Sequence, residues 1–212
     1  KLDRVVATGP TFSPFTSPTG VGWLTTKYDV FNRPVLTSWV AATVTSATRK
    51  TLQDSQNVAI VLSETKIATV TNTTINGVAF RYTTVAWPTS GYHVLTVNYY
   101  DDYNFPNAPI IPSTVETQAV YYNGTVKPKG LSTGSWVRVP ETSALYKSET
   151  SYTLYDYKAR VIRSYTQNHL GGYTYTDNKL NTFTGQVAYT MTRHKRLQGD
   201  AELLTKEAFT YS

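Results

Sequence analysis

Few residues in this sequence have the types and spacing that catalysis or metal binding needs. Three histidines, His93, His169 and His194, have no Cys, Asp or Glu beside them at metal-ligand spacing, which argues against a zinc site. Asp101 and Asp102 are adjacent carboxylates, but neighbours on a strand face opposite ways, so they suit neither a catalytic dyad nor a metal pair. The sequence also has no nucleophile elbow, P-loop or dinucleotide fingerprint. We therefore expect no enzymatic activity, no cofactor and no metal, and keep a β-rich hydrolase as a distant alternative.

Four tryptophans are a possible platform for sugar binding: Trp23, Trp39, Trp87 and Trp136. Large aromatic side chains more commonly pack in the core between strands, and we favour that interpretation here. An extracellular adhesin or carbohydrate-binding module remains the main alternative function. Loss of a measured glycan interaction on Trp→Ala substitution would support it.

The net charge of +6 and the pI near 9.3 raise the question of a nucleic-acid partner. The dense basic run is Arg193-His194-Lys195-Arg196. Nucleic-acid binders usually gather their cations on one face, whereas alternate members of a strand point to opposite faces. We therefore interpret the run as a solvated strand end and expect no nucleic-acid partner.

A short pattern recurs along the chain, as Tyr-Asp-Val-Phe-Asn-Arg at 28–33 and Tyr-Asp-Tyr-Lys-Ala-Arg at 155–160. A weaker copy at 100–105 lacks the arginine. Repeated short units must stack on their neighbours to bury a face. The residues that define the three copies are Tyr28, Asp29, Asn32 and Arg33, then Tyr100, Asp101 and Asn104, and then Tyr155, Asp156 and Arg160.

Each copy is expected to be a tight turn between two strands. An Asp that begins a turn accepts hydrogen bonds from backbone N–H groups two residues on. The fifth position must tolerate positive φ, and Asn32 and Asn104 do so best after glycine. This fits a type I turn followed by a left-handed residue. Ala159 fits poorly, so we expect the 155–160 copy to turn differently.

These residues resemble the YD repeat of RHS proteins, whose usual form is Tyr-Asp-x-x-Gly-Arg. In place of the family glycine, the copy at 28–33 carries Asn32 and the copy at 155–160 carries Ala159. The weak copy at 100–105 carries Asn104 there. Residues 173–177 with 183–186 are similar to one more eroded copy. The resemblance covers most of the chain, with an insertion expected at about 41–88.

The resemblance implies a fold and a function. RHS proteins wind hairpins into a spiral β-shell that encloses or presents a C-terminal effector, often a toxin. By this likeness residues 1–212 form a non-catalytic segment of such a shell, in a bacterial protein that is secreted or at the cell surface. The type IX secretion system is the expected route. The implied partners are the rest of its own chain, including an enclosed C-terminal cargo, and secretion-system components.

The elements expected from the sequence agree with an all-β, mostly antiparallel hairpin meander, since Tyr and Thr favour strands. Strands are predicted at 23–29, 33–40, 136–139 and 149–155, with two-residue hairpin turns at 76–77, 123–124 and 171–172. Residues 4–20 and 105–112 are expected to be irregular, because both stretches are rich in proline.

One helix is predicted at 47–64, capped by Thr45 or Ser46, although Val58–Leu62 could instead be a short buried strand. That apolar run is too short to span a membrane, and no span is expected in this segment. The chain has no cysteine, so disulfides play no part. It begins without Met and stops in a strand-like run, so we expect a segment of a longer protein.

Overall fold

A computed structural model describes residues 3–211, and the chain divides into two compact units. Unit 1 comprises Lys1–Asn98, Asn104–Pro106 and Val137–Lys147, and unit 2 comprises Tyr99–Tyr103, Asn107–Trp136 and Ser148–Ser212. Across the described residues there are fourteen strands and one helix. Nine pairings between these strands are antiparallel, so the predicted all-β, mostly antiparallel class is confirmed.

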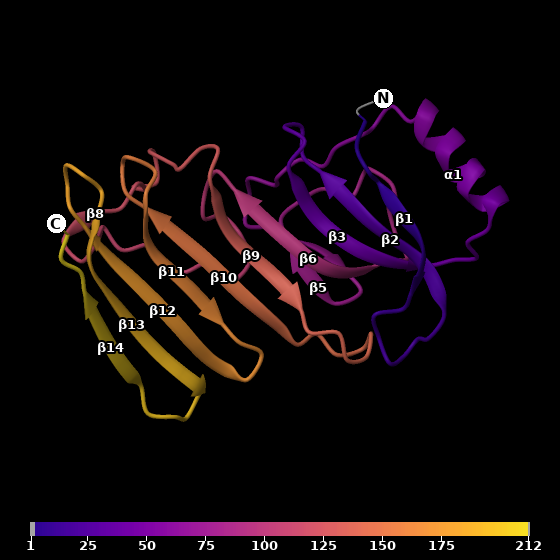
Figure 1. Cartoon of the computed structure of the whole chain (residues 1–212). Helices are drawn as coiled ribbons and strands as arrows, with labels where there is room; N and C mark the ends of the chain where they lie inside the picture. The colour runs from indigo at the N-terminus through magenta and orange to yellow at the C-terminus, as the bar shows by residue number, and fades with distance from the viewer. Residues whose placement is uncertain (1–2, 212) are drawn as a thin grey trace. The chain divides into compact units, whose positions relative to one another are not determined.

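Unit 1 contains a twisted antiparallel sheet with one helix beside it (Figure 1). Its strands, in spatial order, are β1 (Ala7–Phe12), β2 (Val21–Tyr28), β3 (Pro34–Ala41) and β6 (His93–Tyr100). A small separate hairpin is made of β4 (Thr73–Ile75) and β5 (Val78–Phe80). Asn76 and Gly77 connect these two strands, both with positive φ (45° and 79°), as the predicted two-residue turn requires.

The core of unit 1 uses both faces of strand β3, since the neighbouring residues Val35 and Leu36 are both buried. Val35, Leu36 and Val97 come from strands β3 and β6, and Phe80 and Tyr92 come from the segment that follows β4; all five are buried. Each such side chain contributes about 1.5–3 kcal/mol on burial. The β4–β5 hairpin is therefore part of the core of unit 1 and not a surface appendage.

Helix α1 (Ser46–Val58) begins with a capping box. The hydroxyl of Thr45 accepts from the backbone N–H of Thr48 (3.2 Å), and the Thr48 hydroxyl accepts from the N–H of Thr45 (2.8 Å). The helix is shorter than predicted, because Ala59 adopts an extended ψ of 136° and residues 59–64 are irregular. The alternative of a buried strand at 58–62 is wrong, since Ile60 is exposed. The helix contributes no buried residue.

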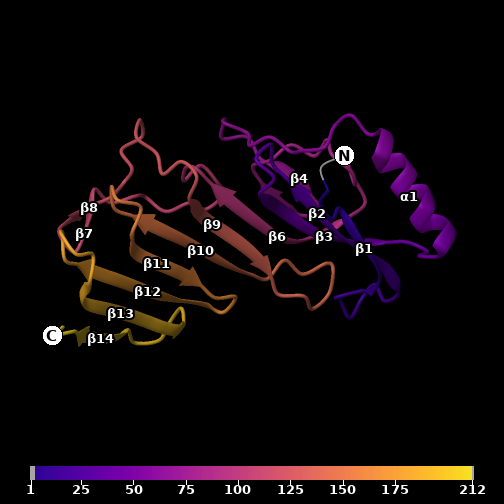
Figure 2. The same ribbon diagram turned by 45° about the horizontal axis from the view of Figure 1, so that its top comes forward.

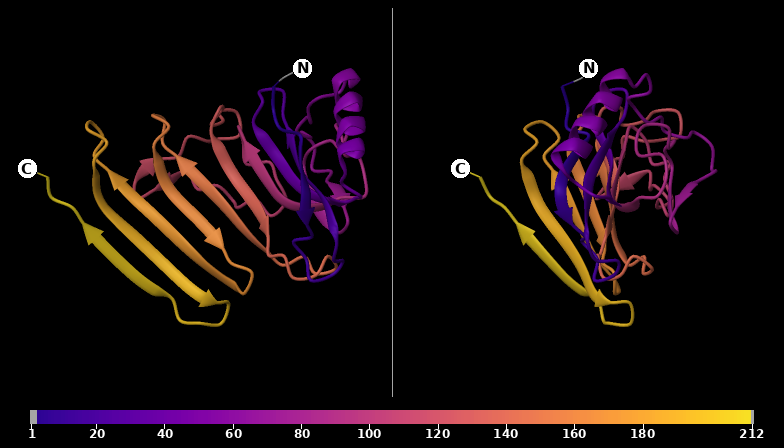
Figure 3. Two further views of the ribbon diagram at one scale, coloured as in Figure 1. Left: turned by 45° about the vertical axis from the view of Figure 1, so that its right-hand side comes forward. Right: turned by 90° about the vertical axis from the view of Figure 1, so that its right-hand side faces the viewer.

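Unit 2 is a hairpin meander, as predicted. Its main strands lie side by side in chain order (Figures 1 and 3): β9 (Ser132–Arg138), β10 (Ser148–Tyr155), β11 (Val161–Gln167), β12 (Gly171–Leu180), β13 (Val187–Leu197) and β14 (Leu203–Ala208). Each strand from β10 to β14 pairs antiparallel with the next. Consecutive neighbours joined by short turns are the arrangement that the predicted meander requires.

A second small hairpin, β7 (Thr114–Val115) and β8 (Gln118–Ala119), lies against strands β12 and β13 (Figure 2). The amide of Gln118 donates to the carbonyl of Asn178 (2.7 Å), and the hydroxyl of Tyr189 donates to Glu116 Oε2 (2.7 Å). One end of the sheet in unit 2 is thus covered by chain from the same unit.

Two local predictions are wrong and one is confirmed. Residues 7–12 form strand β1 despite Pro10, which is tolerated because β1 pairs on one edge alone among the described residues. Asn123-Gly124 is a turn without flanking strands, in which the Asn123 side chain accepts from the N–H groups of Thr125 and Val126. Residues 105–112 are irregular, as expected.

Candidate functional site

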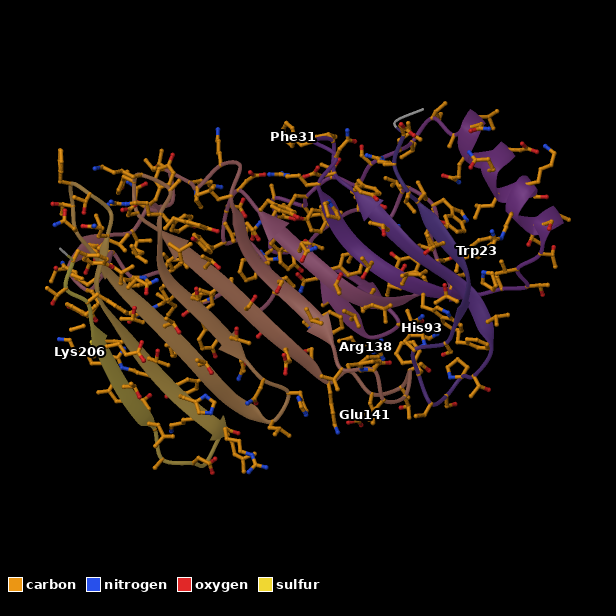
Figure 4. All side chains as sticks on the ribbon, viewed as in Figure 1. Trp23, Phe31, His93, Arg138, Glu141 and Lys206 are labelled. Atoms are coloured by element: carbon orange, nitrogen blue, oxygen red, sulfur yellow. The ribbon has the colours of Figure 1, made fainter. Side chains whose placement is uncertain are left out.

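The turn at 28–33 is built around the carboxylate of Asp29. Its Oδ1 accepts from the backbone N–H groups of Phe31 and Arg33 (both 2.9 Å), and its Oδ2 accepts from Arg33 Nε (2.7 Å). Asn32 takes the left-handed φ of 61°, and the register of the β2–β3 pair shifts between Lys27 and Tyr28, just before the turn. This is the predicted type I turn with a left-handed residue. Figure 4 shows Phe31 projecting from its tip.

The turn at 155–160 has the same bonding, contrary to the prediction that Ala159 would change it. Asp156 Oδ1 accepts from the N–H groups of Lys158 (2.9 Å) and Arg160 (3.0 Å), and Oδ2 accepts from Arg160 Nε (2.7 Å). Ala159 adopts a φ of 60°. A Cβ in this region costs about 1–2 kcal/mol. Three hydrogen bonds to one charged carboxylate offset that cost, which the residue type alone did not reveal.

A third turn of the same kind was missed. Asn168 Oδ1 accepts from the N–H groups of Leu170 and Gly172 (both 2.9 Å), and Gly171 has a φ of 80°. The Asn168 N–H donates to the Gly172 carbonyl (3.0 Å), as that of Asp29 does to Arg33. The prediction of a two-residue hairpin turn at Gly171-Gly172 is therefore wrong. The two glycines end a braced turn, that is, a turn whose first side chain accepts from the N–H groups two and four residues on. The signal was the Asn-x-x-Gly spacing, which matches Tyr-Asp-x-x-Gly-Arg without its charges.

The weak copy at 100–105 is not a hairpin. Strand β6 ends at Tyr100, and the left-handed residue is Asp101 (φ 73°), in place of Asn104. Asp101 Oδ1 accepts from the N–H of Gly130 (2.7 Å). The Asn104 amide instead donates to the carbonyl of Ile67 (3.2 Å). Position 105 is Phe where the two other copies carry Arg, and the next strand begins only at Thr114.

The eroded copy at 173–186 reverses later than its tyrosines suggest. Residues 173–177 lie inside β12, and the turn comes at 181–186, where Asn181 Oδ1 accepts from the N–H groups of Phe183 and Thr184 (both 2.9 Å). Gly185 has a φ of 79°. This turn is one residue longer than the braced turns. It shares with the turn at 168–172 an Asn side chain that accepts from backbone N–H groups and a glycine with positive φ.

Hydrogen bonding lowers the pKa of Asp156 below its usual value. Burial is the largest single effect and would raise the pKa, but hydrogen bonds from Arg160 and Lys158 together outweigh it. The carboxylate is therefore held in its charged form by the turn it braces. The acidic residues of the motif are structural groups, as predicted for Asp29 and Asp156.

Another buried carboxylate lies on the sheet of unit 2. Asp177 is 1 % exposed and accepts from Arg163 through Nε (2.5 Å) and Nη2 (2.7 Å), and from Arg193 Nη1 (3.3 Å). The hydrogen bond to Asp177 raises the pKa of Arg163. Such a bidentate pair fixes both side chains. It also neutralises part of the basic charge on this face.

A row of tyrosines in ring-to-ring contact crosses the same face. Tyr152, Tyr165 and Tyr175 are register partners on β10, β11 and β12, with ring centroids 4.7 and 4.5 Å apart. Desolvation raises the pKa of Tyr152. Cross-strand aromatic pairs of this kind stabilise a sheet by about 0.2–1 kcal/mol each.

The basic run at 193–196 lies on β13, and its members alternate between faces as predicted. Arg193 and Lys195 pair in register with Tyr175 and Tyr173. His194 points the other way, where its Nδ1 lies 2.9 Å from the Thr174 hydroxyl. Cations and aromatics therefore meet on one face, although the charge of Arg193 is engaged by Asp177.

A buried ion pair organises unit 1. Lys27 Nζ lies 2.8 Å from Glu64 Oε1, and both side chains are 1 % exposed. Lys27 also donates to the carbonyl of Ala86 (2.9 Å), and Glu64 accepts from the N–H groups of Val85 and Ala86. Burial lowers the pKa of Lys27. The network joins strand β2 to two loops, so its role is structural.

The tryptophans split into two groups. Trp23 and Trp39 are buried, which confirms core packing for these two, whereas Trp87 and Trp136 are half-buried. Within residues 3–211 no cluster of His, Asp and Glu could hold a metal ion. Over the same residues no helix is long and apolar enough to cross a membrane.

Comparison with family models, with curated proteins and with solved structures finds no match for this chain.

Proposed function

We propose that this chain is a non-catalytic structural segment of a secreted RHS-type protein, whose β-sheet encloses or presents a C-terminal effector. The observation that carries the proposal is the identical bracing of two turns: Asp29 and Asp156 each accept two backbone N–H groups and one arginine Nε. Sequence copies that fold into the same atomic arrangement are the mark of a repeat.

The strand arrangement suits a continuous β-sheet that could form the wall of such a shell. Short braced turns let strand follow strand with little loop, as β10 to β12 do in unit 2. Continuous strand pairing leaves few open edges and suits a surface that isolates a cargo. Secretion or display on a bacterial surface, type IX export and partnership with the rest of a longer chain belong to this proposal.

The test uses the full-length gene product. We expect protease to spare the region that follows this segment in the native protein, and to digest it in the double variant Asp29→Ala/Asp156→Ala, whose braced turns are lost. The matched control is Asp54→Ala, which removes an exposed carboxylate on α1. A following region that is digested equally fast in all three proteins, or a gene that encodes no such region, would overturn the proposal.

A further inference from the structure

A cleft of about 630 Å³ lies between helix α1 and strand β1, within unit 1. The helix contributes side chains three or four residues apart, which share one face: Arg49, Leu52, Gln53 and Gln56. The opposite wall is formed by residues 3–9, which lead into β1 and include its first three residues. Figures 1 and 3 show α1 beside β1. The volume is in the range of sites that hold small ligands or a few peptide residues.

The strand that lines this cleft has an open edge. β1 pairs with β2, and in the described part of the chain no strand pairs with its other edge. The Val6 carbonyl accepts from the N–H of Thr26 (2.9 Å), so Val6 directs its backbone toward β2. In an antiparallel pair the next residue, Ala7, directs its backbone the other way, into the cleft. Such an edge is a template for another strand.

One backbone carbonyl on the open edge of β1 already accepts a hydrogen bond from a side chain. The guanidinium of Arg49 reaches across the cleft and donates to the carbonyl of Gly9. This is the position that the N–H of an added strand would take. Pro10 has no N–H, so the edge available for pairing ends there.

The cleft is also positively charged. Arg49 bonds to a carbonyl, and Arg4 bonds to the carbonyl of Leu62 and to Asn32 Oδ1. These acceptors are neutral, so neither hydrogen bond neutralises an arginine. Asp3 is the one acidic residue among the described residues that line the cleft, and Lys27 is already paired with Glu64. The two arginines therefore leave the cleft with an excess of positive charge. A ligand that supplies a carboxylate would complement them.

We propose that this cleft binds an extended acidic peptide, which adds to β1 as a further strand beneath α1. The peptide N–H displaces Arg49 from the Gly9 carbonyl, and the released guanidinium pairs with a carboxylate of the peptide. Main-chain bonds supply affinity and the two arginines supply selectivity, as in other cases of strand addition. This binding activity is independent of the proposed wall function.

The experiment measures fluorescence anisotropy of two labelled peptides added to the 212-residue protein, acetyl-Thr-Val-Glu-Val-Thr-amide and its Glu→Lys analogue. We expect saturable binding of the Glu peptide alone. Arg49→Glu should weaken it by about tenfold or more. Lys50→Glu is the matched control, because Lys50 makes the same charge change on the same helix but pairs with Asp54 and does not line the cleft.

A second series tests the strand geometry. Methylation of alternate peptide nitrogens should abolish binding in one alternation and leave it in the other, because one set of N–H groups faces β1. Circular dichroism of each variant checks that α1 stays folded. The proposal is overturned by absence of saturable binding, by equal loss in Arg49→Glu and Lys50→Glu, or by tolerance of methylation in both alternations. Saturable binding of a labelled oligogalacturonate without any peptide binding would assign the cleft to acidic sugars and also overturn it.

Discussion

At the scale of single residues, the carboxylate of the braced turn sets the backbone of its neighbours. Asp29 and Asp156 accept the same set of hydrogen bonds, although the left-handed residue three positions later is Asn32 in one turn and Ala159 in the other. The left-handed position is thus dictated by the Asp and the arginine, and the residue in it adapts at some cost in free energy.

Ala159→Gly should stabilise unit 2 by about 0.5–1 kcal/mol, because glycine adopts φ of 60° without a Cβ clash. The free energy of unfolding from urea titration measures the effect. Ala188→Gly, at an exposed position in β13, is the control and should destabilise by a similar amount. Equal destabilisation by both changes would contradict the assigned backbone conformation.

The stabilisation by Asp156 should depend on pH. Its pKa in the folded protein lies below the ordinary value of 3.8, so the carboxylate stabilises the fold above about pH 4 and loses this effect as pH falls through the folded pKa. We expect Asp156→Ala to cost about 1–2 kcal/mol at pH 7 and clearly less at pH 3. Urea unfolding of both proteins at the two pH values measures this difference. A cost that stays constant with pH would show that charge plays no part in the turn.

At the scale of elements, β14 is an exposed strand at the end of the meander. All six of its residues are exposed, and Lys206 lies over the ring of Tyr189 (4.1 Å; Figure 4 labels Lys206). Leu203 and Leu204 therefore present apolar side chains on an edge that natural proteins usually protect.

The isolated 212-residue protein should self-associate through this edge in a concentration-dependent manner. Leu204→Lys should weaken the association by about tenfold, since a charge on an edge strand opposes pairing with a second copy. Sedimentation velocity over a range of concentrations measures it. The control is Leu145→Lys, which adds the same charge at an exposed loop position. A protein that stays monomeric at all concentrations would contradict this role for β14.

The elements also show what sequence reasoning captures. Turns with a local cause were predictable. At Asp29 the cause is a side chain that binds nearby N–H groups, and at Asn76-Gly77 it is two residues that tolerate positive φ. The end of α1 at Val58 was not, because no proline or glycine marks it and the chain leaves the helix at Ala59. Strand β1 was not predicted, because the prolines of residues 4–20 argue against a strand and the sequence does not show that β1 pairs on one edge alone.

At the scale of the whole molecule, the all-β class followed from the Tyr and Thr content and from the turn signals between strands. The features that define a candidate site did not follow. The Lys27–Glu64 pair joins residues 37 positions apart, and the α1–β1 cleft depends on a helix that buries nothing. Both depend on tertiary contacts between distant segments, for which a single sequence carries no periodic signal.

The buried pair of Lys27 and Glu64 has a consequence for how this protein can change over time. Loss of either partner leaves an isolated charge in the interior, at a cost of about 3–5 kcal/mol, whereas joint replacement by apolar residues of similar volume is often nearly neutral. Descendants of this chain should therefore keep both residues or exchange both, with single exchanges removed by selection. Substitution at Lys27 in strand β2 is therefore expected to be coupled to substitution at Glu64 in the loop.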